Sequence, residues 1–533
     1  MILYNTLSHE REEFVPNEPG KVKMYTCGPT VYHYAHIGNL RSYIMEDVLQ
    51  KYLEYSGYDV KRVMNITDVG HLTSDGDTGD DKMLKGARRE HKTVMEIAKF
   101  YTDAFFEDCR KLNIKKPGIV QPATGCIAEF IEMIKTLMDK GYAYEAGGNI
   151  YFDTSKLEKY YVFHDFEEED LAVGVREGVE ADGNKRNKAD FVLWFTKSKF
   201  DSQELKWESP WGVGYPGWHI ECSAIALKYL GDIHCGGIDN AFPHHTNEIA
   251  QSEAYLGHKW CNYWFHVLHL NTEGGKMSKS KGNVIYADDL VDMFGVDAVR
   301  YFVLHEMPFE NDGVISWELI VERMNSDLAN TLGNLVNRTI AMSNKYFGGV
   351  VNKTGVTSEG AGVDENGASL DFDADLKAVV TGTRDKVQNK MATLHVADAM
   401  TDVFALFKRC NKYIDETMPW ALAKDESKKE RLEEVLYNLV ESITIGANLL
   451  KAFMPNTTES ILKQLYPDNP AAGDRDFDDL DKFGLRESGN KVTDKPEILF
   501  ARLDIEEVMK KVEELQEAQN KIDDAQQEIN DIE

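Results

Sequence analysis

The strongest constraint on the fold of this chain is a strand–helix–strand pattern near its start. Residues 22–26 (Val-Lys-Met-Tyr-Thr) predict a short buried strand that ends at the turn sequence Cys-Gly-Pro-Thr. Apolar residues then recur at spacings of three and four from Leu40 to Leu53, which predicts a helix, and residues 58–66 predict a second strand. Two strands joined by a crossover helix form a βαβ unit, so we expect an α/β fold with a parallel sheet.

Periodicity divides the rest of the chain into regions of different structure. Further helices and strands are expected in the first half, at about residues 93–112, 126–140, 150–152, 191–195 and 231–235. Residues 164–190 are acidic and Gly-rich, which suggests an exposed insertion. From about residue 290 to 466 nearly every segment has helical periodicity, apart from a Gly-, Thr- and Asp-rich loop over 349–372. Residues 467–497 are polar and irregular, which suggests a linker.

The last segment, residues 498–533, is expected to form an amphipathic helix. Its apolar residues recur every three or four positions, with two glutamines at seam positions: Ile505, Val508, Val512, Leu515, Gln519, Ile522, Gln526 and Ile529. The pattern fits a short coiled coil in a weak homodimer, and it fits equally a helix packed on its own domain in a monomer. We expect this helix to follow an α/β domain over 1–290, a helical domain over 291–466 and the linker.

Composition narrows the class of protein. The 533 residues include seven widely spaced cysteines, an odd number that argues against a disulfide framework and for a reducing cytoplasm. No apolar run is long enough to span a membrane, and the first residues lack the pattern of a secretion signal. The formal charge of −30 argues against a broadly basic nucleic-acid-binding surface, but it leaves room for a local basic groove.

Residues 36–39 (His-Ile-Gly-Asn) form the first of two motifs that suit a nucleotide. They lie where the chain passes from the first strand into the helix, and a helix start presents free N–H groups and a positive dipole end to phosphates. Gly38 allows close approach of a ligand to the backbone, and His36 and Asn39 can donate hydrogen bonds to phosphate oxygens. The tetrapeptide alone is a weak signal, because such short sequences recur by chance.

Residues 274–283 (Gly-Gly-Lys-Met-Ser-Lys-Ser-Lys-Gly-Asn) form the second motif. Lysines on a Gly-flanked loop can close over a triphosphate and stabilise the charge of a transition state, whereas in isolation such a loop is more often a solvated basic turn. The two motifs in this order resemble the H-I-G-H and K-M-S-K-S signatures of class I aminoacyl-tRNA synthetases. Asn39 replaces the last histidine of the first signature and keeps a hydrogen-bond donor.

This resemblance implies a Rossmann-like catalytic domain followed by a helical anticodon-binding bundle. It also implies that ATP binds with Mg²⁺. The catalytic residues would be His36, Asn39, Lys276 and Lys279, and Gly38 and Ser278 would join the two lysines in binding ATP.

Four separated residues have side chains that suit a metal ion: Cys27, Cys222, His244 and Glu248. His244 and Glu248 are four residues apart, which puts them on one face of a helix. Thiolates combined with an imidazole and a carboxylate suit zinc, although a lone buried cysteine is more often a small core residue.

The chain around these four residues resembles the cysteinyl-tRNA synthetases. The matching segments are residues 24–32, 65–68, 185–187, 191–194, 216–223 and 232–252. The resemblance implies that the four residues bind one Zn²⁺, that the thiolate of the substrate L-cysteine becomes a further ligand, and that the amino-acid pocket contains Thr67, Trp218, His234 and Asp239. The sequence departs from the family at Cys235, where glycine is expected, and at Thr246, where glutamate is common; Cys235 could perturb the pocket or act as a decoy thiol.

A bound zinc ion would explain how the protein distinguishes cysteine from serine. Cysteine and serine differ by one atom, and packing discriminates weakly between molecules so similar in shape. A zinc ion binds a thiolate strongly and a neutral hydroxyl poorly, and it lowers the pKa of the thiol that it binds. Such a site needs no editing domain, and no segment of the chain suggests one.

The second half of the chain resembles a different family, the methionyl-tRNA synthetases. The matching segments are residues 294–302, 325–330, 333–338, 344–349, 419–424 and 495–504. The resemblance implies that Asn334, Arg338 and Trp420 read the anticodon, since splayed bases stack on aromatic rings and bond to polar side chains. The alternative is that Trp420 is a core residue at a helix start and that the other two are surface residues.

The sequence therefore predicts a cysteine–tRNA ligase with partners ATP, L-cysteine and tRNA. The mismatch between its halves leaves the tRNA open: it is a cysteine tRNA, or a methionine-type or special tRNA. Two other functions stay open at this point. One is a cysteine ligase acting on a small amine, which the long helical half disfavours, and the other is a non-charging tRNA-binding paralogue, which the intact lysine and metal-ligand positions disfavour.

Overall fold

The computed structural model describes residues 2–69, 92–163, 183–197, 205–229, 231–272, 275–277, 284–306, 312–357 and 371–532. The chain forms two compact units. The first contains residues 1–269 and 521–533, and the second contains residues 270–520. The predicted α/β fold class is confirmed, because the first unit is built on a parallel sheet and the second is almost entirely helical.

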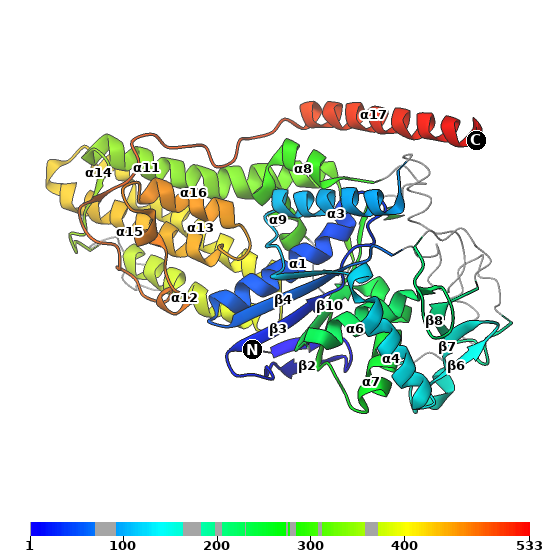
Figure 1. Ribbon diagram of the computed structural model, residues 1–533. Helices are drawn as coiled ribbons and strands as arrows, with labels where there is room; N and C mark the ends of the chain where they lie inside the picture. The colour runs from blue at the N-terminus through cyan, green and yellow to red at the C-terminus, as the bar shows by residue number, and fades with distance from the viewer. Residues whose placement is uncertain are drawn as a thin grey trace. The chain divides into compact units, whose positions relative to one another are not determined.

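A five-stranded parallel sheet forms the centre of the first unit (Figure 1). Its strands, in spatial order, are β11 (Tyr263–Val267), β10 (Ile233–Gly237), β3 (Lys21–Thr26), β4 (Asp59–Ile66) and β5 (Ile119–Pro122). The order of the strands reverses beside β3, because the chain continues to β4 on one side and reaches β10 only later on the other. Ligands of open parallel sheets bind at such a reversal, outside the carboxyl ends of the strands.

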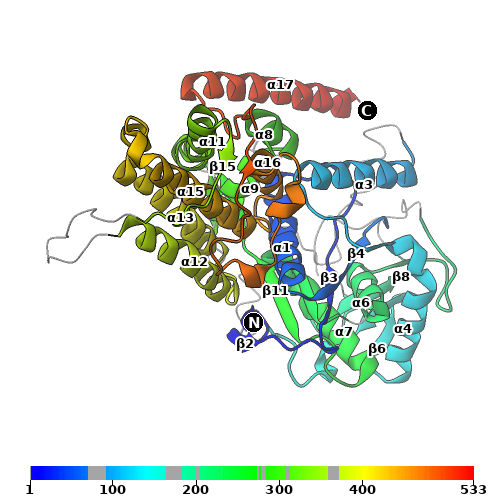
Figure 2. The ribbon, with the colours of Figure 1, turned by 90° about the vertical axis from the view of Figure 1, so that its left-hand side faces the viewer.

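Helices cover both faces of this sheet (Figure 2). Helix α1 (Ile37–Tyr55) packs on one face through fully buried residues such as Leu40 and Ile44, which confirms the periodicity of the sequence. Helix α6 (Trp218–Tyr229) contacts the other face at β4 and packs against α4 (Ile127–Asp139) and α7 (Thr246–Leu256). The predicted helix near 93–112 is α3 (Val94–Lys111), capped at its start by Thr93.

A second, antiparallel sheet lies between the two halves of the parallel sheet in the sequence. Its strands are β6 (Ala143–Ala146), β7 (Asn149–Phe152), β8 (Phe191–Phe195) and β9 (Tyr215–Pro216). The acidic insertion expected over 164–190 lies between β7 and β8 in the sequence, and its residues 164–182 lie outside the described residues. A two-stranded sheet of β1 (Ile2–Asn5) and β2 (Glu10–Glu13) precedes β3.

Long helices dominate the second unit. They are α8 (Ala287–Phe294), α9 (Val296–His305), α10 (Trp317–Arg323), α11 (Asn334–Phe347), α12 (Phe372–Met391), α13 (Val396–Thr417), α14 (Pro419–Leu422), α15 (Lys429–Leu449) and α16 (Pro455–Leu465). Helix α15 lies at the centre of the bundle and contacts α11, α12, α13 and α16. Its residues from Val435 to Leu449 are buried on every side. The polar residues among them have partners inside the unit: Nδ2 of Asn448 donates to the backbone oxygen of Gly473, and Glu441 accepts from the N–H of Gly484.

Short strands begin this unit and interrupt its helices. Strand β12 (Leu270–Thr272) pairs with β13 (Gly275–Lys276) and with β14 (Gly313–Ile315). Strand β15 (Val350–Val351) opens the segment that the sequence suggests is a loop between helices. Residues 358–370 of that segment lie outside the described residues.

Residues 467–497, which the sequence suggests are a linker, pack against the helical bundle in the structure. Arg475 forms a buried ion pair with Glu441 of α15, with Nη2 2.7 Å from Oε2. Strand β16 (Asn490–Lys491) pairs with β15. The sequence of this segment shows no local periodicity because its residues pack against distant parts of the chain.

The predicted C-terminal helix is α17 (Ile505–Ile532). Val508 and Val512 are buried, whereas Ile505 is 38% exposed. The predicted seam positions Gln519, Ile522, Gln526 and Ile529 lie where side chains are outside the description. Among the described residues, no helix has both the length and the apolar character needed to cross a membrane.

Candidate active site

A cavity of about 160 Å³ opens at the carboxyl edge of the parallel sheet, where the strand order reverses. Its walls come from the turn after β3, the first half of α1 and the segments after β10 and β11. The lining residues are Cys27, Gly28, Gly38, Asn39, Ser42, Tyr43, Glu46, Gly236, Gly237, Ile238, Asp239, Asn240, Val267, Leu268 and His269. Gly38 and Asn39 of the first nucleotide motif therefore lie where a ligand of this fold is expected.

The first motif also builds the start of α1. The Nδ1 atom of His36 accepts a hydrogen bond from the backbone N–H of Asn39 at 3.2 Å, and Oδ1 of Asn39 accepts one from the N–H of His36 at 3.2 Å. This reciprocal capping box holds both side chains at the helix start. The amide N–H₂ group of Asn39 is not used in this cap, so it can still donate to a ligand.

Gly28 lets two strand ends meet beside the cavity. Its N–H donates to Oδ1 of Asn65 at 2.7 Å, and a Cβ atom at this position would lie 1.7 Å from the backbone oxygen of Asn65. Any other residue would push the turn after β3 away from β4. The tight turn therefore fixes the position of Cys27, which precedes Gly28.

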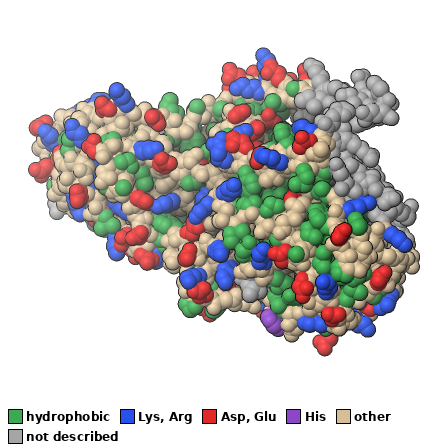
Figure 3. Space-filling model, viewed as in Figure 1, with side chains coloured by type: hydrophobic (Ala, Val, Ile, Leu, Met, Phe, Trp, Pro, Cys, Tyr) green, Lys and Arg blue, Asp and Glu red, His purple; other side chains and the backbone are tan. Residues whose placement is uncertain are grey.

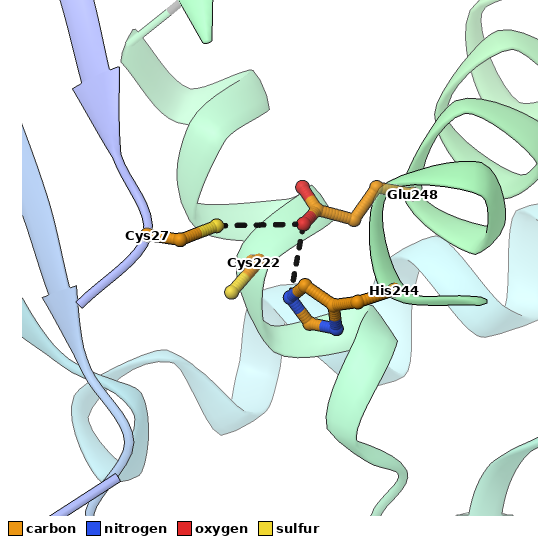
Figure 4. A group of neighbouring side chains, drawn as sticks. All are labelled: Cys27, Cys222, His244 and Glu248. Atoms are coloured by element: carbon orange, nitrogen blue, oxygen red, sulfur yellow. Dashed lines mark hydrogen bonds and ion pairs between the residues drawn. The ribbon is translucent and has the colours of Figure 1, made fainter. Parts of the chain in front are cut away.

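The four predicted metal ligands lie together beside this cavity (Figure 4). Their ligand atoms are all within 4.8 Å of one another, and all four side chains are buried. His244 precedes α7 and Glu248 lies in its first turns, and Nε2 of His244 is 3.0 Å from Oε1 of Glu248. Cys27 follows β3, with its Sγ 3.7 Å from the same oxygen, and Cys222 comes from α6. Cys27 also lines the cavity, so the group and the cavity share a wall.

The charges in this group depend on one another. Hydrogen bonding to Cys27 lowers the pKa of the Cys222 thiol to about 7, while burial raises the pKa of Cys27 well above its usual range. Burial alone would lower the pKa of His244, but Cys222 and Glu248 outweigh it and raise the pKa to about 10. Burial would likewise raise the pKa of Glu248, which His234 and His244 instead lower to about 2. The group gathers negative charge that a divalent cation can neutralise in place of protons.

Aromatic and histidine side chains hold the metal-ligand group in place. The ring of Trp218 stacks on that of His244 with centroids 4.3 Å apart, and Nδ1 of His219 lies 2.9 Å from Nδ1 of His244. Contacts to Nδ1 leave Nε2 of His244 directed at Glu248, as expected for a ligating histidine oriented by a neighbour.

A second set of residues that could hold a metal ion was not expected from the sequence. It consists of Cys27, His234, His245 and Glu248, and it shares two members with the first set. Nε2 of His245 lies 3.1 Å from Sγ of Cys27, and Nδ1 of His245 lies 2.7 Å from Nε2 of His266. The adjacent histidines 244 and 245 are the one local sign of this set in the sequence, but the set also needs His234 of β10 and Cys27 after β3. The first set has two thiols and therefore suits zinc better.

The residues predicted for the amino-acid pocket occupy different parts of the site. The imidazole of His234 stacks near Tyr25 and lies 3.3 Å from Glu248, and Trp218 covers His244. Thr67 follows β4 and accepts a hydrogen bond from Asn65. Asp239 lines the cavity with Gly38 and Asn39, and its Oδ1 is 3.2 Å from Nε2 of His269.

Cys235 lies on the opposite face of β10 from His234, because successive strand residues alternate between faces. It is fully buried, and burial raises its pKa well above the usual range, as does the nearby carboxylate of Glu46. Glu46 belongs to α1 and is paired with Arg62 on the face of the sheet away from the metal-ligand group. Cys235 is therefore a buried core residue on the face of β10 away from the metal-ligand group.

The remaining predicted residues lie in the second unit. Ser278 and Lys279 of the K-M-S-K-S loop are outside the described residues, as is the side chain of Lys276 at the end of β13. Asn334 and Arg338 are one turn apart on α11, and Nη2 of Arg338 lies 3.7 Å from Oδ1 of Asp415 in α13. Trp420 lies in α14 and is 44% exposed, so the alternative that it is a core residue is wrong.

Comparison with known proteins identifies the family of this chain. Residues 13–311 match the family described as tRNA synthetases class I (C) catalytic domain. The chain belongs to the class I tRNA synthetases. Residues 363–520 of this synthetase match a second family, the anticodon binding domain of methionyl tRNA ligase. The predicted mosaic of a cysteine-type first half and a methionine-type second half is confirmed.

Relatives of this synthetase include three bacterial proteins named cysteine–tRNA ligase. The Treponema denticola protein is 55% identical over 320 residues, which cover 59% of this chain and 64% of that protein. The Borreliella burgdorferi protein is 44% identical over 66% of this chain and 77% of its own length, and the Clostridioides difficile protein is 48% identical over 57% and 63%. The chain thus spans about two thirds of the length of the relatives that it matches.

Solved structures extend the likeness of fold to the second half. Methionyl-tRNA synthetase of Mycobacterium tuberculosis in complex with methionyl-adenylate matches with a TM-score of 0.70. The match covers 90% of this chain and 100% of that one at 22% sequence identity. A likeness at this identity concerns the fold, which confirms a class I architecture followed by helices.

Proposed function

We propose that this synthetase is a cysteine–tRNA ligase: it activates L-cysteine with ATP and transfers the cysteinyl group to the 3′ end of a tRNA. The observation that carries the proposal is the shared wall at Cys27. One side of this wall is the nucleotide-type cavity, and the other is a buried group of two thiols, an imidazole and a carboxylate. A cysteine whose thiol reaches the group would hold its carboxylate toward the cavity.

The first step of the proposed reaction is formation of cysteinyl-adenylate. The carboxylate of cysteine attacks the α-phosphorus of ATP in line, a P–O bond forms, and the bond to pyrophosphate breaks. The Asn39 amide and His36 at the start of α1 would donate to phosphate oxygens, with the helix dipole adding to the attraction. Lys276 and Lys279 would stabilise the charge on the departing pyrophosphate together with Mg²⁺, and Gly38 and Ser278 would contact ATP.

We assign one zinc ion to Cys27, Cys222, His244 and Glu248. These four donors fit zinc, because zinc ions in proteins are bound by cysteine sulfur, histidine nitrogen and carboxylate oxygen. When bound there, zinc would supply selectivity for a thiolate over a hydroxyl. Trp218 and His219 orient His244 for this role, and Thr67, His234 and Asp239 would complete the recognition of the substrate.

The acceptor is proposed to be a cysteine tRNA. The α/β domain, assigned to residues 1–290, would hold its 3′ end, and the helical domain of residues 291–466 would hold its anticodon stem. Trp420 is exposed in α14, and Asn334 and Arg338 share one face of α11. A ring can stack on any base, so these residues suit a cysteine anticodon as well as a methionine anticodon. The surface in Figure 3 mixes Lys and Arg with Asp and Glu, so the net charge of −30 does not exclude local contacts to phosphates.

The proposed setting is a reducing cytoplasm. All seven cysteines are free in the structure, and all are buried. Free thiols persist where glutathione and thioredoxin keep cysteines reduced.

The decisive experiment is exchange of labelled pyrophosphate into ATP, measured with cysteine and with serine. We expect exchange that depends on cysteine and is weak with serine, followed by cysteine-dependent charging when tRNA is added. Absence of exchange would leave only a tRNA-binding protein. Exchange without charging of any tRNA, combined with ligation of cysteine to a small amine, would instead support the small-amine ligase.

A further inference from the structure

An exposed aromatic cluster lies next to the first nucleotide motif, and the reaction described so far does not use it. Tyr34 is 44% exposed and Phe100 of α3 is 41% exposed. Their ring centroids are 6.1 Å apart, and both rings pack edge-on against Tyr101, at 5.1 and 5.0 Å. His33 stacks beside Tyr101 at 5.8 Å. We call Tyr34 and Phe100, with the supporting Tyr101, the aromatic platform.

The platform carries a positive charge at its edge. Nζ of Lys92 lies 4.3 Å from the centroid of the Phe100 ring, and the lysine itself is exposed. This combination places two rings, each more than 40% exposed, beside a cation and leaves aromatic surface open to a ligand. It is the usual arrangement of a surface that binds single-stranded nucleic acid, where bases stack on rings and cations meet the backbone.

The platform adjoins the cavity through two separate connections. Tyr34 is two residues before His36, a separation of at most about 7 Å along the chain. Phe105, one helical turn after Tyr101 on α3, packs edge-on at 4.9 Å against Tyr43, which lines the cavity. These two connections place the platform beside the start of α1, on the side of the cavity that Tyr43 lines.

We propose that the aromatic platform stacks an unpaired base of the tRNA 3′ end and so guides the terminal ribose to the adenylate. This inference rests on the proposed function, which requires that single-stranded end to reach the cavity. A protein partner fits less well, because two exposed rings beside a lysine are far smaller than a stable protein interface. A stacked base needs only one ring face, and it gains from the neighbouring cation.

Binding to RNA without any reaction tests the platform directly. The probe is an RNA hairpin with the acceptor-stem sequence of a cysteine tRNA and an unpaired 3′ end whose last adenine is replaced by fluorescent 2-aminopurine. We expect the parent protein to change the probe's fluorescence and Tyr34→Ala to weaken its binding about 10-fold, as expected for loss of one stacked base. Tyr34→Phe keeps the ring and should bind as the parent does.

Phe106→Ala is the matched control, because Phe106 lies on the same helix and also has a lysine, Lys116, 4.7 Å from its ring. It should leave binding of the probe at the parental value. Thermal unfolding of all three variants checks that they are folded. Equal binding by Tyr34→Ala and the parent, or equal losses in Tyr34→Ala and Phe106→Ala, would overturn the proposal.

Kinetics separate this proposal from the proposed function. Tyr34→Ala should raise the KM for tRNA in charging about 10-fold and reduce cysteine-dependent pyrophosphate exchange much less. If exchange falls as far as charging does, the tyrosine supports the cavity and the platform is no RNA site. If the parent shows no exchange but binds the probe through Tyr34, the proposed function fails while the RNA site stands.

Discussion

The two units of this synthetase present their functional side chains in opposite ways. In the first unit Cys27, Cys222, His244 and Glu248 are at most 7% exposed and already contact one another. In the second unit Trp420 is 44% exposed, and the ion-pair partner of Arg338 is an exposed aspartate, Asp415. A buried polar group needs its hydrogen-bond partners within the protein, whereas an exposed side chain can find a partner in a ligand. Under the proposed function, selection of the amino acid would use groups that the fold has already assembled, and recognition of RNA would be completed only on binding.

This contrast predicts which reaction a substitution in each unit will affect. Changes in the buried group should affect activation of cysteine in the absence of any RNA. Changes on α11 or α14 should affect only reactions that include tRNA. Pyrophosphate exchange, which needs no RNA, and tRNA charging therefore distinguish the two kinds of change.

The largest effect is expected for Cys222→Ser. Loss of one thiol should remove the bound zinc and lower cysteine-dependent exchange by about 10³-fold or more, since even loss of a partner of a metal ligand costs about 10–100-fold. Binding of ATP should change little, because the proposed phosphate contacts are at the start of α1, whereas Cys222 belongs to α6. Elemental analysis measures the zinc content, and exchange kinetics measure the activation of cysteine.

Cys126→Ser is the matched control, since Cys126 is a buried thiol of the same hydrophobic core but lies outside both metal-ligand sets. It should keep one zinc per chain and nearly parental exchange. The assignment of the metal site fails if freshly purified parent contains no zinc, or if Cys222→Ser exchanges at the parental rate.

A somewhat smaller effect is expected for Lys279→Ala. A charge that acts mainly in the transition state contributes to kcat, so the single-turnover rate of adenylate formation should fall about 10²–10³-fold. The affinity for cysteine should hardly change, because the thiol is bound elsewhere. Lys281→Ala removes the neighbouring lysine that follows the K-M-S-K-S signature of residues 276–280, and it should be nearly neutral. A parental single-turnover rate in Lys279→Ala would contradict the role given to this loop.

The smallest effect is expected for Trp420→Ala, and it should appear only in reactions that include tRNA. Loss of one stacking contact costs about 1–3 kcal/mol, so charging of a cysteine tRNA should weaken about 10-fold at limiting tRNA while exchange stays parental. Trp420→Phe keeps an aromatic ring and should recover most of the loss. Parental charging by Trp420→Ala would mean that recognition depends on the acceptor stem and that Asn334, Arg338 and Trp420 are not used.

The sequence predicted those features that depend on local pattern. Helix α1 and strands β3 and β4 follow from apolar periodicity within short windows, and the glutamate four residues after His244 placed both on one side of a helix. The division of the chain into a cysteine-type and a methionine-type half followed from its motifs and is matched by two families.

Features made by distant residues could not be predicted in this way. Packing of residues 467–497 on the bundle depends on Arg475 meeting Glu441 of α15. The second metal-capable set brings His234 of β10 to His245, and the aromatic platform joins Tyr34 to α3. The capping box between His36 and Asn39 is local, but its residues were assigned to the ligand alone. A side chain can serve the fold and the ligand together, and a motif does not distinguish the two.

The central claim is that a cysteine-activating unit and a methionine-type bundle together charge a cysteine tRNA. Parallel charging with labelled cysteine, using a cysteine tRNA transcript and a methionine tRNA transcript with the CAU anticodon, tests it most directly. We predict efficient attachment of cysteine to the cysteine transcript and little to the other. Efficient charging of the CAU transcript alone, lost in Trp420→Ala, would contradict the account and assign the choice of tRNA to the helical bundle.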